Sequence, residues 1–173
     1  SNKIEKPVDF YFNNEKNLVI PDEYINNFRD IMIQLIRNSI THGIEERNIR
    51  LTNGKLIGGS IAIDLEHPDD ADDIVVIYKD DGRGLDLPKI REREIMRNLI
   101  TDFEAENMLA DKAVELIYES GFSTADEVDE HSGRGQGMNL VKNLIHDMNG
   151  TFSVEFEEDQ YFKMIIKLPM HPH

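Results

Sequence analysis

The sequence predicts an α+β fold, a two-layer sandwich in which helices cover one face of a β-sheet. Three observations support this class. Two amphipathic helices lie far apart in the chain, segments typical of β-strands surround them, and the last two of these segments form a hairpin. The 173 residues show no internal repeat and fit one domain of ordinary size, which we place at residues 8–170.

The N-terminal half begins with residues 1–7, which read as a tag remnant and a frayed start. Residues 8–12 have the composition of a strand. Apolar residues at three- and four-residue spacing then predict a helix that begins near Pro21 and ends at Gly43. Residues 44–60 carry three glycines among charges and predict a loop.

The C-terminal half contains the remaining strands and the second helix. A long, charged segment of about residues 86–132 separates a central strand from this helix. The continuous apolar run of the central strand is typical of a strand buried on both faces. The predicted elements are strands at 61–65 and 74–78, a helix at 138–148, and a hairpin of strands at 152–156 and 162–168.

The composition excludes several classes of protein. The chain has 19 basic and 34 acidic residues, a formal net charge of −15, so neither nucleic acid nor an anionic membrane is an expected partner. No apolar run approaches the roughly 20 residues of a membrane span. The chain has no cysteine, which excludes disulfides, zinc–thiolate sites and thiol nucleophiles and suits a reducing cytoplasm.

The first candidate site lies on the N-terminal helix. Gln34, Asn38 and His42 are each four residues apart. Four residues advance a helix by only about 40°, so these side chains line one stripe beside the apolar face. Asn38 and His42 can each reach a ligand or a metal-bound water. On an isolated helix, the simpler interpretation would be exposed polar residues.

The second candidate site is Asp80-Asp81-Gly82-Arg83-Gly84, directly after the central strand. A carboxylate at the strand end, followed by glycines, lets the backbone approach a ligand closely. An ionised carboxylate only accepts hydrogen bonds, so Asp80 suits the amino group of an adenine ring better than a phosphate. A simple strand-to-turn junction is the alternative.

The third candidate site is the segment Ser132-Gly133-Arg134-Gly135-Gln136-Gly137-Met138, which directly precedes the second helix. Alternating glycines allow successive backbone N–H groups to point at an anion, and the helix N-terminus adds positive potential. An acidic protein can bind phosphates in this way. The segment is neither a Rossmann fingerprint nor a Walker loop, because it lies near the C-terminus and no Gly-Lys-Ser/Thr follows.

These motifs occur in the order of those in the chemotaxis histidine kinases. Residues 34–45 resemble the asparagine box of that family, and Asp80 to Asp86 its first glycine box. Ser132 to Met138 resembles the second glycine box, and residues 121–125 resemble a short motif inside the family's nucleotide lid. The resemblance implies the Bergerat ATP-binding fold of the GHKL superfamily, a mixed sheet with helices on one face and a long ATP lid, here about residues 86–132.

The resemblance also implies a role for each site. Asn38 would hold Mg²⁺ that bridges the phosphates of ATP, His42 would lie near them, and Asp80 would accept from adenine. Gly82 and Gly84 would shape the adenine pocket. The expected phosphate contacts are Lys89, Arg93, Gly133, Gly135 and Gly137. The other expected nucleotide-binding residues are Ser132, Arg134, Gln136 and Met138.

The implied activity is transfer of the ATP γ-phosphoryl group to a histidine of a phosphotransfer domain, in the same or another chain. A response regulator would act downstream in two-component signalling, in the cytoplasm. Gln34 departs from the family, which has His or Glu there, and an amide cannot accept a proton at neutral pH. Gln34 could therefore only orient the acceptor ring.

Two alternatives to a histidine kinase remain open. The first is a nucleotide-sensing, catalytically degenerate module that transfers no phosphate. The second is an ATP-driven clamp like gyrase or the mismatch-repair ATPases, which the motif at residues 121–125 disfavours. Asn139 replaces an aspartate of the family, and Tyr161-Phe162 replaces a Gly-Thr pair before the last strand.

Overall fold

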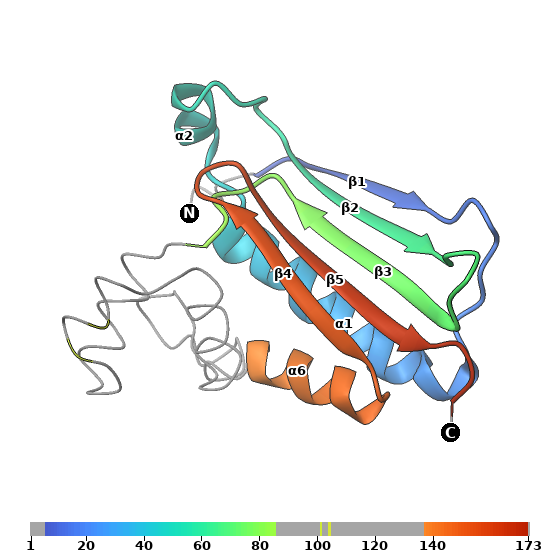
Figure 1. Cartoon of the computed structure of the whole chain (residues 1–173). Coiled ribbons are helices and arrows are strands. Elements are labelled where there is room, and N and C mark those ends of the chain that lie inside the picture. Colours follow the sequence, from blue (N-terminus) through green and yellow to red (C-terminus); the bar gives the residue numbers. More distant parts are fainter. Residues whose placement is uncertain (1–5, 86–100, 102–103, 105–136, 173) are drawn as a thin grey trace. The chain divides into compact units, whose positions relative to one another are not determined.

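A computed structural model describes residues 6–85, 101, 104 and 137–172. The chain divides into two units, residues 1–85 with 143–173, and residues 86–142. The first unit holds all five described strands and the first four described helical segments (Figure 1).

The strands and the long helices follow the prediction closely. The strands are β1 (Val8–Asn13), β2 (Gly59–Glu66), β3 (Asp73–Asp80), β4 (Thr151–Glu157) and β5 (Tyr161–Pro169). The helical segments are η1 (Asp22–Tyr24), α1 (Ile25–Asn38), η2 (Ser39–Gly43), α2 (Arg47–Thr52) and α6 (Gly137–Asp147).

The five strands form one mixed sheet in the order β1-β2-β3-β5-β4. β1 pairs with β2 in parallel, and the other neighbours pair antiparallel. β3 is therefore the central strand, as its continuous apolar sequence predicts, and its Asp80 pairs with Ile61 of β2 and Phe162 of β5. The mixed sheet with helices on one face confirms the predicted α+β class.

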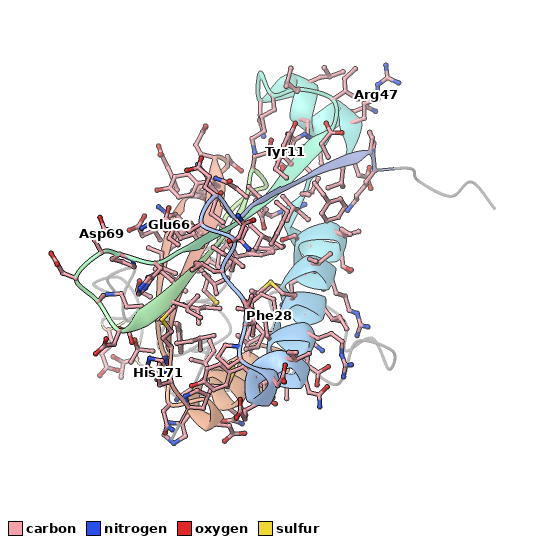
Figure 2. All side chains as sticks on the ribbon, turned by 90° about the vertical axis from the view of Figure 1, so that its right-hand side faces the viewer. Tyr11, Phe28, Arg47, Glu66, Asp69 and His171 are labelled. Atoms are coloured by element: carbon pink, nitrogen blue, oxygen red, sulfur yellow. The ribbon has the colours of Figure 1, made fainter. Side chains whose placement is uncertain are left out.

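The core lies between the sheet and its helices. α1 and the C-terminal part of α6 cover one face of the sheet, and side chains such as Phe28 fill the space between α1 and the strands (Figures 1 and 2). Side chains alternate between the two faces of a strand. Tyr78 and Asp80 of β3 thus share the helix-covered face, and both are almost fully buried. The fold thus places the Asp80 carboxylate at the end of the central strand, on the face covered by helices.

The prediction fails in two places between α1 and β2. Residues 44–60 are not entirely a loop, because Arg47–Thr52 forms the short helix α2. The helix that begins near Pro21 also does not reach Gly43 in α-helical form. Its last five residues, Ser39–Gly43, form a single π-helical turn, in which the Ile44 amide donates to the Ser39 carbonyl over 2.6 Å.

Candidate functional site

The π-helical turn packs directly against the turn that follows β3. The Arg83 amide donates to the Gly43 carbonyl oxygen over 2.8 Å. A Cβ added to Gly82 would overlap that carbonyl group, and a Cβ added to Gly43 would lie 3.3 Å from Asp80 Oδ2. Close approach of the two backbones therefore requires glycine at position 82, and a side chain at position 43 would crowd the Asp80 carboxylate. This contact joins the asparagine box to the first glycine box.

Asp80 is held at this junction by two donors. Its Oδ2 atom lies 2.5 Å from Ser39 Oγ, and its Oδ1 atom accepts from the Gly82 amide over 2.9 Å. Burial raises the pKa of Asp80, and the neighbouring charges of Asp81 and Glu45 act in the same direction. The hydrogen bonds from Ser39 and Gly82 oppose this rise in pKa. Each carboxylate oxygen keeps acceptor capacity beyond the one donor that holds it.

Tyr78 extends this network into the core. Its hydroxyl lies 2.5 Å from Ser39 Oγ and donates to the Leu35 carbonyl over 3.0 Å. Burial raises the pKa of Tyr78, so its phenol is neutral at physiological pH. Ser39, Gly43 and Tyr78 were not among the predicted site residues. Ser39 could have been found from its place next to Asn38, on the buried side of the helix. Tyr78 could have been found from its two-residue spacing from Asp80, which puts both side chains on the same face of the strand.

Gly84 joins the same turn to the β4–β5 hairpin. It has a positive φ of 71°, and a Cβ there would lie 2.8 Å from the Glu157 carbonyl oxygen. The Asp159 amide donates to the Arg83 carbonyl over 2.8 Å, from the turn between the two strands. The first glycine box is therefore fixed on both sides, by the π-helical turn and by the hairpin.

The predicted stripe on the first helix is partly realised. Gln34 and Asn38 lie one turn apart at the C-terminal end of α1, and His42 lies in the π-helical turn after it. All three side chains are half-buried. The Asn38 carbonyl oxygen would lie 3.7 Å from a Cβ at Gly43, the position that also approaches Asp80. The structure thus brings the Asn38 backbone and the Asp80 carboxylate to the same junction.

Several predicted site residues lie outside the described part of the chain. They are Lys89, Arg93, Ser132, Gly133, Arg134, Gly135 and Gln136, together with the lid assigned to about residues 86–132. Of the second glycine box, the structure describes Gly137, where α6 begins, and Met138, whose side chain is half-buried. The roles of all these residues stay predictions.

Among residues 6–85, 101, 104 and 137–172, no group of three or more His, Cys, Asp or Glu side chains could hold a metal ion. Mg²⁺ commonly keeps several waters and binds through one or two protein oxygens plus phosphates. Asn38 can supply one such oxygen.

In the same part of the chain, no helix combines the length and apolarity needed to span a membrane.

Comparison with protein families gives a match over most of the chain. Residues 26–172 match the family described as histidine kinase-, DNA gyrase B-, and HSP90-like ATPases. Solved structures of low sequence identity share the fold. A mycobacterial sensor histidine kinase, MprB, aligns with a TM-score of 0.58 and 16% identity over 96% of this chain and 84% of that chain. The nucleotide-free catalytic domain of the histidine kinase ThkA aligns with a TM-score of 0.51 and 19% identity, over 94% and 79%.

Curated relatives are similar at higher identity. The chemotaxis protein CheA of Bacillus subtilis is 39% identical over 146 residues, which cover 84% of this chain and 21% of that protein. The gliding motility regulatory protein of Myxococcus xanthus is 34% identical over 164 residues, which cover 95% and 21%.

The chain spans about a fifth of the length of the curated relatives it matches. The resemblance to the chemotaxis kinases, first evident from four short motifs, is confirmed over the domain. Of these motifs, the asparagine box and the first glycine box meet where the π-helical turn contacts the turn after β3, and the family match includes both segments. This chain belongs to the family of histidine kinase-, DNA gyrase B- and HSP90-like ATPases.

Proposed function

We propose that this chain is the ATP-binding catalytic domain of a CheA-like histidine kinase, which transfers the ATP γ-phosphoryl group to a histidine of a separate phosphotransfer domain. The observation that carries the proposal is the buried Asp80 carboxylate at the end of β3, oriented by Ser39 and Gly82. The family match and the relatives named as CheA support the same assignment.

Asp80 selects adenine in this proposal. An ionised carboxylate accepts hydrogen bonds and donates none, so it complements the exocyclic amino group of adenine. Guanine presents a carbonyl oxygen at that position, which would face the carboxylate with no hydrogen between them. Buried polar groups left unpaired make such discrimination strong.

In this proposal Asn38 binds the phosphates of ATP through Mg²⁺, and the second glycine box binds them through its backbone N–H groups. Asn38 offers a neutral oxygen to Mg²⁺, and bound Mg²⁺ neutralises the charge of the phosphate oxygens. His42 lies within the same half-buried region after α1. Gly137 lies at the N-terminus of α6, where backbone N–H groups and the helix dipole favour an anion.

Gln34 sets the rate of phosphoryl transfer in this proposal. It lies one turn before Asn38, so its amide oxygen can orient the acceptor imidazole but cannot remove a proton at neutral pH. Phosphoryl transfer depends mainly on positioning and electrostatic stabilisation. The domain is therefore a slow kinase, acting in the cytoplasm with a phosphotransfer domain and a downstream response regulator.

The test is transfer of labelled γ-phosphate to the cognate phosphotransfer domain, followed by assay of the acid lability of the product. We expect slow labelling by the wild type and faster labelling by Gln34→His or Gln34→Glu. If the wild type binds ATP but labels no phosphotransfer domain, and neither substitution restores labelling, the domain is a nucleotide sensor and the kinase proposal is wrong.

A further inference from the structure

A second set of charges, two of them buried and two partly exposed, contacts the turn after Asp80 and has no place in the proposed chemistry. The ion cluster consists of Glu45, Arg50, Lys55 and Asp81, two carboxylates and two cations. Arg50 and Glu45 are 1% and 2% exposed. Burying charged groups is costly unless each is paired and hydrogen-bonded. The cluster is formally neutral, and its cations bond to carboxylates and backbone carbonyls of the protein. We therefore expect a structural role for it.

The short helix α2 and the turn after it present the two cations to the cluster. Arg50 lies within α2, and Gly54, with a positive φ of 73°, turns the chain after it. The Lys55 amide then donates to the Arg50 carbonyl over 2.9 Å, which closes the turn. The Arg50 and Lys55 side chains reach opposite oxygens of Glu45, at 3.2 Å and 2.6 Å. Glu45 thus holds the two cations side by side.

Both cations bind the peptide group that follows Asp81. Lys55 Nζ lies 2.9 Å from the Asp81 carbonyl oxygen and 2.9 Å from the Gly82 carbonyl oxygen. Arg50 Nη1 donates to the same Asp81 carbonyl over 3.3 Å, and Arg50 Nη2 donates to Asp81 Oδ2 over 2.7 Å. The Ser60 amide completes the set by donating to Asp81 Oδ1 over 2.8 Å.

The other end of this peptide group faces Asp80. The carbonyl of Asp81 and the N–H of Gly82 belong to one planar, trans peptide unit, so they point in opposite directions. The cations hold the carbonyl end, and the N–H end donates to Asp80 Oδ1 over 2.9 Å. A cation on the carbonyl oxygen also polarises the N–H, which strengthens its bond to the carboxylate.

We propose that Lys55, supported by Glu45 and Arg50, is a positioning residue for adenine recognition, acting on Asp80 through the Asp81–Gly82 peptide. This inference rests on the proposed function, in which Asp80 accepts from the adenine amino group. Without Lys55 the Asp81 carbonyl loses its shorter bond and keeps the 3.3 Å bond from Arg50, and the Gly82 carbonyl of the next peptide loses its bond from Lys55, so the Asp81–Gly82 peptide is held less firmly. The Asp80 carboxylate then loses the donor that fixes its orientation toward the base, while its bond from Ser39 remains.

The test compares two nucleotides that differ in one group. ATP and purine riboside triphosphate, which lacks the 6-amino group, are titrated with Mg²⁺ into the whole protein by calorimetry. The measured quantity is the ratio of their dissociation constants. Losing a well-oriented hydrogen bond to a charged group should change this ratio roughly tenfold. A change that only loosens the site would weaken both nucleotides equally and leave the ratio unchanged.

Two variants and one control are needed. Lys55→Met removes the cation, and Lys55→Met with Glu45→Gln also removes the buried carboxylate charge that the first change leaves unpaired. The control is Lys16→Met. Its ammonium also bonds a carbonyl and a carboxylate, those of His67 and Asp69. These partners lie between β2 and β3, at the opposite end of β3 from Asp80.

The expected result is a roughly tenfold fall in discrimination for both Lys55 variants and no change for Lys16→Met. Unchanged discrimination in both Lys55 variants, or an equal loss of both nucleotides, overturns the positioning role. Failure of the proposed function is distinguishable: the wild type would then bind no ATP, or Asp80→Asn would discriminate between the two nucleotides as well as the wild type does.

Discussion

Ser39 Oγ lies 2.5 Å from Asp80 Oδ2, and the same oxygen lies 2.5 Å from the Tyr78 hydroxyl. With the contact from Tyr78 to the Leu35 carbonyl, three close oxygen pairs share only two hydroxyl hydrogens. An ionised Asp80 therefore leaves one pair without a hydrogen between its oxygens. A protonated Asp80 would complete all three.

This relationship predicts how stability depends on pH. Burial raises the pKa of Asp80 above its unfolded value of about 3.9, so the folded state favours the protonated carboxyl. The contribution of the protonated Asp80 carboxyl to stability is fully present below the unfolded pKa and is lost as the pH rises through the folded pKa. Asp80→Asn does not titrate at this position. We expect the free energy of unfolding of the wild type, relative to Asp80→Asn, to fall as the pH rises above about 4.

The measurement is urea unfolding of both proteins across this range of pH. The titratable groups nearest Asp80 are Tyr78, Asp81 and Glu45, with Arg50 and Lys55 behind them, and all are retained in the variant. A difference that instead grows in favour of the wild type with rising pH would mean that the folded state prefers ionised Asp80.

The contact between the two glycine-containing turns predicts a second result. Gly82→Ala should lower the free energy of unfolding by about 1–3 kcal/mol, the cost of overpacking, because its Cβ would overlap the Gly43 carbonyl. Gly58→Ala is the matched control, since its Cβ would lie at an ordinary 3.4 Å from the Pro7 carbonyl oxygen. Equal stability of the two variants in urea would contradict this account of the junction.

Removal of metal tests the assignment of Asn38. EDTA should weaken ATP binding by the wild type, because Mg²⁺ would no longer link Asn38 to the phosphates. Asn38→Ala should bind ATP weakly with or without EDTA. Asn26→Ala, an exposed asparagine at the opposite end of α1, should behave like the wild type. Fluorescence titration with an ATP analogue can follow all three, and a wild type that ignores EDTA would exclude the metal role.

The sequence predicted the strands and the long helices well because their signals are local. Apolar spacing located α1, although not its ends, and the uninterrupted apolar run identified β3 as the central strand. The prediction missed the π-helical turn at Ser39–Gly43, since the same residues have ordinary helical spacing. That turn accompanies a contact with Gly82, which lies about forty residues further along the chain.

Prediction of the site was also limited to contacts between residues that are close in the sequence. Asp80 was identified from its place after a strand, which is a local pattern. Arg50 fell within residues 44–60, which were predicted as a loop, and charged residues are rarely fully buried without partners. Its partner Asp81 lies 31 residues away, so only the folded chain could reveal the pair.

The most direct test of the account is the affinity of Asp80→Asn for ATP, measured by calorimetry with Mg²⁺. Asparagine replaces an acceptor oxygen by an amide that can donate, so the bond from the adenine amino group is lost. We predict a loss of about 1.5–3 kcal/mol in binding free energy, and poor binding of GTP by the wild type. Equal affinity of the wild type and Asp80→Asn for ATP would contradict the central claim.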